Sequence, residues 1–421
     1  MHICRALWPS AGARQSDSPI AFYSIMKICI MTLDRHSLVE AGQRIFYKTA
    51  RLMAQRGHDV TLVVEKEVDC GIPIEESGIR VLTIPKYLRF PFLRGGFSPG
   101  AIIHRTWLVL NEEFDIIYVN PGIRPAMLFP VVFARLFTRS KIVEEVWEWF
   151  GRGGVGSFRR GFMQRSVGMY DLVFERISKM LAHGLVVISS PLKERYSRHR
   201  KCVVLHGAVE SDLLHGISTG DARVKLGIDQ NLIIFGMCSL DAGDQEDNVP
   251  ALRALATVCR QHSNIRALVT GNKEFIEREI FRILPSDKVI YPGWVPIYEY
   301  ADYLSSCNYF VLPYPPTNRN LGRWPNKFGD YVLMRRPLIT NPTGDIGELC
   351  AGNKIGWLCE NSESAYEELF RKLIANGECE NEFAFDEMRE KLMTFEERAD
   401  FLMDLFDRLA KGQDWKMSQQ Q

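Results

Sequence analysis

The sequence predicts an α/β protein with two domains, each built on a parallel β-sheet. Three observations support this fold class. The chain has 421 residues, which is long for one domain, and its 46% hydrophobic content is enough for two cores. Residues 27–64 read as strand, helix, strand, the order of a βαβ unit. A second series of strands and helices in the same order starts at residue 231.

Composition and charge exclude several function classes. The 52 Lys and Arg residues against 51 Asp and Glu leave a net charge of +1, so no overall field favours nucleic acid as a partner. The ten cysteines include no Cys-x-x-Cys pair and no Cys/His cluster at zinc spacing, which indicates reduced thiols and no zinc site built from cysteines. The longest apolar stretch, residues 126–137, is too short to cross a bilayer. We therefore expect a cytoplasmic protein without a transmembrane segment.

The first domain is predicted to begin at Met26. Residues 1–25 have no apolar period and lack the basic start and apolar core of a secretion signal, so they are a disordered leader or Met26 is the true start. A strand over 27–31, a polar loop over 34–42, a helix over 44–56 and a strand over 59–64 follow. Gly57 and His58 end the helix, which makes His58 a structural residue rather than a catalyst.

The rest of this domain is predicted to alternate in the same way. Strands are expected over 79–85, 115–120, 141–150 and 184–190, and helices over 125–137, 170–183 and 191–200. A Pro/Gly-rich loop over 88–100 and a Gly/Arg-rich loop over 151–165 are of the kind that shapes binding sites, although the second is also explained as a solvated connection.

The helix over 125–137 has two interpretations. It is apolar on several faces, which is typical of a buried packing helix. Basic residues flank it, namely Arg124, Arg135, Arg139 and Lys141. A helix of this kind also suits contact with a membrane surface or a lipid-linked acceptor.

The second domain is predicted from residue 206 onward. Strands are expected over 231–240, 265–271, 289–294 and 309–314, and helices over 249–261 and 298–306. The loop over 241–248 is acidic, with Asp241, Asp244, Glu246 and Asp247. A solvated loop explains these acids, and a bound divalent metal is the alternative.

The stretch from Arg319 to Glu348 is the most informative part of the sequence. Pro325 suits the first turn of a helix through Phe328 and Tyr331, and Pro337 ends that helix. A strand over 338–340 and a turn lead to a second helix start near Asp345. Helix N-termini attract anions, so two of them with a lysine in the first turn indicate a diphosphate site.

This stretch resembles the nucleotide-sugar site of glycosyltransferases with two Rossmann-like domains, the GT-B architecture, and is most similar to the family 4-like (group 1) retaining enzymes. The matching residues are Pro325, Lys327, Asp330, Tyr331, Pro337, Gly344 and Glu348, with Asp330 in place of a glutamate. The resemblance implies two domains that face each other across a cleft. It divides the chain into a leader (1–25), an acceptor domain (26–205), a donor domain (206–394), a helix that returns to the first domain (395–410) and a disordered tail (411–421).

The resemblance also implies roles for individual residues. Lys327 and Arg323 are expected on the donor diphosphate and Asp330 on the ribose. The helix start at Gly344, Asp345, Gly347 and Glu348 is expected on phosphate or sugar, Gly293 and Trp294 on the nucleobase, and Ala41 and Gly42 in the first-domain loop near the substrates. Glu148 and Lys327 are the expected catalytic residues.

Two departures from the family pattern bear on activity. Trp147 stands where relatives have a histidine that faces the sugar, which leaves Glu148 or Glu145 as the acidic group there. Trp147 and Trp149 either stack on sugar rings or belong to the core. The acidic loop over 241–248 replaces an Arg and a Lys, so Arg319, Arg323 and Lys327 are the expected substitutes.

The predicted function is transfer of a sugar from a nucleotide-diphosphate sugar to an acceptor hydroxyl, with retention of configuration and without a metal or cofactor. The acceptor is expected among lipid-linked molecules or cell-envelope glycans, in polysaccharide or glycoconjugate biosynthesis. The alternatives are a catalytically silent subunit that binds a partner enzyme and a nucleotide-sugar epimerase.

Overall fold

The structure is a computed structural model, and it describes residues 24–33, 44–64, 78–84, 96–158, 162–199, 201–210, 217–240, 245–293, 295, 297–376, 383–413 and 415. Four predicted features lie wholly or mostly outside these residues. They are the expected leader, the loop with Ala41 and Gly42, Trp294, and residues 416–421 of the expected tail.

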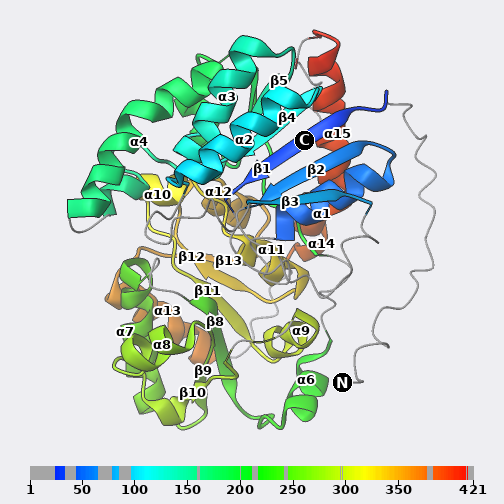
Figure 1. Cartoon of the computed structure of the whole chain (residues 1–421). Helices are drawn as coiled ribbons and strands as arrows, with labels where there is room; N and C mark the ends of the chain where they lie inside the picture. The colour runs from blue at the N-terminus through cyan, green and yellow to red at the C-terminus, as the bar shows by residue number, and fades with distance from the viewer. Residues whose placement is uncertain are drawn as a thin grey trace, which may run out of the picture.

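The first domain is built on a seven-stranded sheet in which every strand runs parallel to its neighbours. The sheet order is β3-β2-β1-β4-β5-β6-β7 (Figure 1). The strands are β1 (Lys27–Thr32), β2 (Asp59–Val64), β3 (Arg80–Thr83), β4 (Ile116–Asn120), β5 (Lys141–Val146), β6 (Gly184–Val187) and β7 (Cys202–Val204). The central strands are buried on both faces, which explains their continuous apolar runs.

Helices cover both faces of this sheet. Cys29 and Met31 of β1 pack with α2 and α3, whereas Ile28 and Ile30 pack with α1 and the last helix, because successive strand residues point to opposite faces. The helices are α1 (Arg44–Gln55), α2 (Pro99–Asn111), α3 (Pro125–Phe137), α4 (Phe162–Leu181) and α5 (Ser190–Arg195).

Two helices of the first domain begin at positions where the sequence predicts loops. The expected loop over 88–100 is described only from residue 96, and its last two residues begin α2, which was not predicted. Pro99 sits in the first turn of α2, where a proline costs no hydrogen bond. The predicted loop over 151–165 is also too long, because α4 begins at Phe162 rather than near Tyr170.

The second domain has a six-stranded sheet, again with parallel pairing, in the order β10-β9-β8-β11-β12-β13. Its strands are β8 (Ile233–Leu240), β9 (Ile265–Gly271), β10 (Val289–Ile290), β11 (Tyr309–Leu312), β12 (Leu338–Thr340) and β13 (Gly356–Leu358). Its helices are α6 (Thr219–Leu226), α7 (Gln245–Gln261), α8 (Lys273–Phe275), α9 (Ile297–Ser305), α10 (Asn318–Leu321), α11 (Asn326–Leu333), α12 (Gly344–Gly352), α13 (Glu363–Asn376) and α14 (Phe385–Glu390). The predicted fold class, two parallel-sheet α/β domains, is confirmed.

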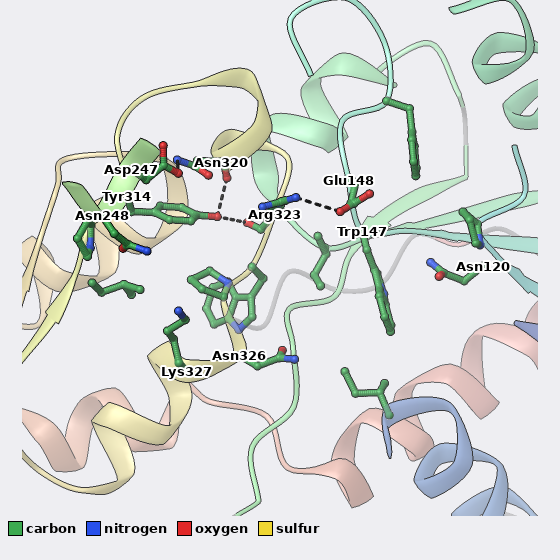
Figure 2. Close-up of a pocket in the computed structure, with 18 residues that line it drawn as sticks. Asn120, Trp147, Glu148, Asp247, Asn248, Tyr314, Asn320, Arg323, Asn326 and Lys327 are labelled. Atoms are coloured by element: carbon green, nitrogen blue, oxygen red, sulfur yellow. Dashed lines mark hydrogen bonds and ion pairs between the residues drawn. The ribbon is translucent and has the colours of Figure 1, made fainter. Parts of the chain in front are cut away.

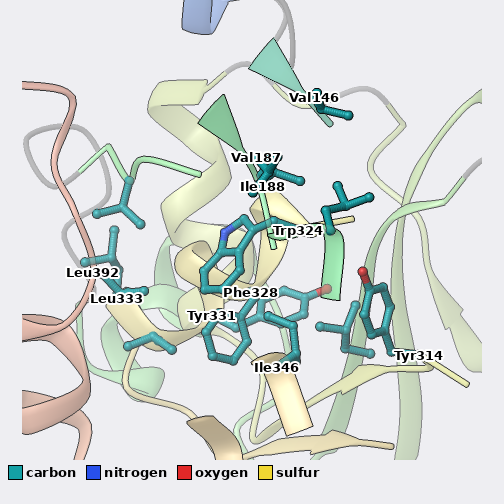
Figure 3. Close-up of a cluster of buried hydrophobic side chains, with 14 of the residues drawn as sticks. Val146, Val187, Ile188, Tyr314, Trp324, Phe328, Tyr331, Leu333, Ile346 and Leu392 are labelled. Atoms are coloured by element: carbon teal, nitrogen blue, oxygen red, sulfur yellow. The ribbon is translucent and has the colours of Figure 1, made fainter. Parts of the chain in front are cut away.

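The two domains share one hydrophobic cluster. Val146 and Ile188, from strand ends of the first sheet, belong to the same buried cluster as Trp324 and Phe328 of the second domain (Figure 3). His206, which follows β7, stacks on Trp324 with ring centroids 4.1 Å apart. This packing fixes the two sheets relative to each other.

The last helix, α15 (Phe395–Ala410), returns to the first domain and packs on α1 (Figure 1). Its Arg398 forms an ion pair with Glu145 of β5, and both side chains are almost completely buried. Arg398 also donates to the carbonyl oxygen of His206 at 3.0 Å. Glu145 is therefore part of a structural ion pair, and this corrects the alternative that placed it at the sugar.

The start of the expected tail is in contact with the first domain. Lys201 donates to the carbonyl oxygen of Gln413 at 3.1 Å, and Trp415 is buried. A side chain on Gly184 would collide with the ring of Trp415, so the strand end and the indole are in direct contact.

The described cysteines are all free, and most are buried. Burial raises the pKa of Cys29 to about 12, with the neighbouring charge of Glu112 as a second cause. Such thiols are weak nucleophiles, because the reactive form is the thiolate. In the described part of the chain, no helix has the length and hydropathy that a membrane span requires.

We expect Arg398→Met to destabilise the protein by about 3–5 kcal/mol, because it leaves the Glu145 carboxylate buried without a partner. The measurement is chemical denaturation followed by circular dichroism. The control is Arg408→Met on the same helix, whose ion pair with Asp404 is partly exposed and should cost less than about 1 kcal/mol. Equal losses in the two variants would contradict this assignment.

Candidate active site

A cavity of about 390 Å³ lies between the two domains. Residues that directly follow strands of both sheets line it (Figure 2). The lining residues are Ile45, Asn120, Pro121, Trp147, Glu148, Phe150, Ile188, Asp247, Asn248, Leu312, Pro313, Tyr314, Asn320, Arg323, Trp324, Pro325, Asn326 and Lys327. Ligands of open parallel sheets bind at the carboxyl ends of strands where the strand order reverses, and here two such edges face each other.

The second-domain wall of the cavity is anchored to the core of its sheet. Tyr331 of α11 stacks on Phe310 of β11 with ring centroids 3.9 Å apart, and its hydroxyl accepts from the backbone N–H of Cys238 in β8 at 3.0 Å. Tyr331 is therefore structural, and it holds the first turn of α11 beside the end of β8.

Lys327 lies in this first turn and lines the cavity. Its ammonium group donates to the carbonyl oxygens of Cys238 at 3.2 Å and Ser239 at 3.5 Å. Among the residues that the structure describes, no carboxylate forms an ion pair with Lys327. Its positive charge is consequently available to an anionic ligand.

Arg323 bridges the two domains. Its guanidinium lies 3.2 Å from the carboxylate of Glu148, which follows β5 of the first domain (Figure 2). Both side chains line the cavity and are about one-third exposed. The predicted catalytic residue Glu148 is thus held by the predicted diphosphate ligand Arg323.

Arg319 was expected to help replace the missing Arg and Lys at the donor phosphates, but the structure pairs it with a carboxylate. Its guanidinium is buried and pairs with Asp247 in the first turn of α7 at 2.5 Å. Asn320 donates to the same carboxylate at 3.0 Å. Asp247 therefore neutralises Arg319, and this part of the acidic loop has a counter-ion in the protein. Asp241 and Asp244 lie outside the described residues.

The two tryptophans occupy different positions. Trp147 lines the cavity and stacks on Phe46 of α1 with ring centroids 4.9 Å apart, so one ring face is taken by the protein. The guanidinium carbon of Arg195 lies over the ring of Trp149, 4.3 Å from the ring centroid. A side chain on Gly322 would collide with Trp149, which makes this tryptophan part of the domain contact.

Several predicted donor residues do not line the cavity, namely Asp330, Gly293, Gly344, Asp345, Gly347 and Glu348. Asp345 is largely shielded between the domains, where its carboxylate accepts from Nε2 of His206 and from the backbone N–H of Ser190, each at 2.8 Å. Burial acts to raise the pKa of Asp345, but these hydrogen bonds outweigh it and hold the pKa below its usual value. Ala41, Gly42 and Trp294 lie outside the described residues.

The sequence analysis missed five polar residues of the cavity wall: Asn120, Asn248, Tyr314, Asn320 and Asn326. The buried Nδ2 of Asn248 has no hydrogen-bond partner among the described residues, so it is free to donate to a ligand. Asn120 and Tyr314 end or directly follow strands, and that position was a usable signal.

Residues 236–376 match the family model described as glycosyl transferases group 1. This span covers the strands of the second sheet and contains Arg323 and Lys327. The resemblance to family 4-like glycosyltransferases, and with it the prediction of an enzyme of the glycosyltransferase class, is confirmed. No curated protein sequence matches the chain.

Solved structures share the whole architecture at low identity. A sucrose-phosphate synthase from Thermosynechococcus elongatus is 14% identical with a TM-score of 0.72, and the match covers 92% of this chain and 100% of that one. Anabaena HepE in complex with UDP and glucose is 12% identical (TM-score 0.64; 92% and 98% covered). WaaG, a glycosyltransferase involved in lipopolysaccharide biosynthesis, is 12% identical (TM-score 0.55; 91% and 98% covered). At these identities the likeness establishes the GT-B fold.

We expect Asp345→Asn to lower the melting temperature at pH 7, with a loss of about 1–3 kcal/mol, because two hydrogen bonds to a largely shielded charge are weakened. The carboxyl pKa is depressed in the folded state, so this contribution is present above about pH 4 and is lost as the pH falls further. Calorimetry at several pH values measures it. The control is Asp386→Asn in an exposed ion pair. A difference between wild type and Asp345→Asn that persists unchanged at pH 3 would contradict this account.

Proposed function

We propose that this chain, a GT-B protein whose second domain matches group 1 glycosyltransferases, transfers a sugar from a nucleotide-diphosphate sugar to an acceptor hydroxyl with retention of configuration. The observation that carries the proposal is the cavity between the two strand edges, which Lys327 and Arg323 line with positive charge. The proposed acceptors are glycans or glycoconjugates of the cell surface.

The diphosphate is assigned to the second-domain wall. Lys327 supplies a positive charge in the first turn of α11, where backbone N–H groups also favour an anion. Asn248, in the first turns of α7, supplies an unpaired amide N–H. Arg323 supplies a second cation once it leaves Glu148. Each of these groups stabilises the negative charge that grows on the departing diphosphate.

The geometry favours retention over inversion. Inversion needs a free general base beside the acceptor, whereas the two carboxylates in the described part of the cavity wall are in ion pairs, Glu148 with Arg323 and Asp247 with Arg319. In the proposed reaction the bond between the sugar carbon and the diphosphate oxygen breaks, and a bond from that carbon to the acceptor oxygen forms on the same face. The acceptor proton passes to the departing phosphate oxygen, and the protein positions the two substrates.

The same ion pairs disfavour an epimerase, which needs acid and base groups at a sugar carbon. The first donor base to test is uracil. HepE was solved with UDP and with UDP-glucose, and a Staphylococcus aureus protein of the same fold, MnaA, was solved with UDP at a TM-score of 0.56.

We expect UDP to raise the melting temperature of the chain, because a ligand that binds only the folded state stabilises it, by about 2.7 kcal/mol at a hundred times its Kd. Lys327→Ala should abolish this rise while it leaves the melting temperature without ligand nearly unchanged, since only two hydrogen bonds to carbonyl groups are lost. A thermal-shift panel of UDP, GDP, ADP, CDP and dTDP measures both effects.

The matched control is Lys354→Ala, a lysine of the same domain that does not line the cavity. If a diphosphate other than UDP is the one that stabilises the chain, the assignment of uracil as the donor base is wrong and the transferase proposal stands. If no diphosphate stabilises the wild type, the proposal fails, and the silent subunit becomes the better account. If Lys327→Ala binds as well as wild type, the diphosphate assignment fails.

We expect Glu148→Gln to bind UDP more tightly by a few-fold, because the diphosphate no longer competes with the Glu148 carboxylate for Arg323. A half-exposed ion pair is worth less than about 1 kcal/mol, which limits the gain to about fivefold. Isothermal titration calorimetry gives the affinity. Glu210→Gln is the control and should bind as wild type does, because Glu210 pairs with Lys48 and neither residue lines the cavity. Weaker binding by Glu148→Gln would contradict the competition.

A further inference from the structure

Three neighbouring helices of the first domain expose large apolar side chains. α2 packs on α3 and α3 packs on α4, and they lie together on one side of the molecule (Figure 1). The most exposed residues, which we call the apolar face, are Ile103 and Trp107 of α2, Leu136 and Phe137 of α3, and Met169 and Met180 of α4, each at least 60% exposed. In the rest of the described chain, exposed large apolar residues occur only singly, at Ile25, Ile217, Val224 and Leu358.

The arrangement on α3 shows that this exposure is organised. Phe129, Phe133, Leu136 and Phe137 recur at helical spacing on the solvent side, while Met127, Val131 and Ala134 pack on the sheet. A helix that is apolar all round is normally covered on all sides. Large exposed apolar side chains that gather on neighbouring helices indicate a binding surface for a protein or a membrane.

The charged side chains that are exposed on the three helices are of one sign. Among their described side chains, the exposed charged residues are Arg135, Arg165 and Arg176. Past the helix ends, Arg139 follows α3 and the exposed Glu113 follows α2. The acidic residues of α4, Asp171 and Glu175, are buried in ion pairs with Arg124 and Arg195. A surface that approaches the three helices therefore meets apolar side chains and arginines.

We propose that the apolar face binds peripherally to an anionic lipid bilayer. Large apolar side chains beside arginines are the features that seat a surface helix at the boundary between head groups and acyl chains, and anionic lipids add attraction for each arginine. A second copy of this chain fits less well, because a twofold contact through this face would bring the same arginines together. The inference needs no nucleotide or acceptor, so it does not rest on the proposed function.

The test is co-sedimentation of the full chain with vesicles of phosphatidylcholine alone or of phosphatidylcholine and phosphatidylglycerol in a 7:3 ratio. We expect binding to the anionic vesicles, little binding to the neutral ones, and a loss of at least about tenfold at 0.5 M NaCl, where charges are screened within a few ångström. Leu136→Gln with Phe137→Gln and, separately, Arg135→Gln with Arg176→Gln should each weaken binding about tenfold or more. Val224→Gln, an exposed apolar residue of α6, is the control and should bind as wild type does.

A second measurement identifies the part of the chain that enters the bilayer. Trp107 is exposed on α2, so brominated lipids should quench part of the tryptophan fluorescence of wild type, and Trp107→Phe should remove that quenching. Unchanged melting temperatures show that the variants fold. Absence of binding to anionic vesicles, equal binding by all variants, or a dimer in sedimentation equilibrium that Leu136→Gln with Phe137→Gln dissociates would each overturn the proposal.

Discussion

The contact of Trp324 with the first domain is the interaction on which the cavity depends. The indole is buried in the cluster that both domains share, stacks on His206 and meets Phe328 edge to face. Gly207 has no room for a side chain, because a Cβ there would lie 2.6 Å from the indole. Arg323 directly precedes Trp324 and reaches Glu148 of the first domain. Two residues after Trp324, α11 begins, with Lys327 in its first turn. One aromatic contact thus sets the positions of both cations relative to the first sheet.

Charge pairing is the second constraint. An unpaired buried charge is costly, and Arg319, which is buried, has Asp247 as its carboxylate partner. Arg323, which is partly exposed, pairs with Glu148. Lys327 alone among the three rests on neutral carbonyl oxygens. The pairing explains how a loop with several acids coexists with an anion site. It also means that a diphosphate exchanges partners with Glu148 rather than entering an empty positive pocket.

The first domain places the cavity wall and the exposed apolar side chains on different elements. The carboxyl ends of β4 and β5 supply Asn120, Trp147 and Glu148 to the cavity, while α2, α3 and α4 on one face of the sheet carry the exposed apolar side chains. The loop that follows β4 connects the two places, because Pro121 lines the cavity and α3 begins four residues later. The proposed membrane contact on the outer side of α3 would therefore hold the first-domain wall of the cavity beside the bilayer surface.

The sequence by itself determined the fold class and the main donor segment. Apolar runs, helical periods and glycine or proline stops locate most strands. The pattern in the stretch from Arg319 to Glu348 identifies the segment that carries Arg323 and Lys327. Both results rest on local signals. Short-range patterns missed α2 and the true start of α4, where glycine, proline and arginine residues suggest loops. The tertiary structure alone decided which charges meet. Glu145 pairs with Arg398, Asp247 with Arg319 and Asp345 with His206 across long stretches of chain. The sequence does not indicate which basic residue a carboxylate pairs with. Ion pairing depends on distances that exist only after the two sheets and α15 have packed.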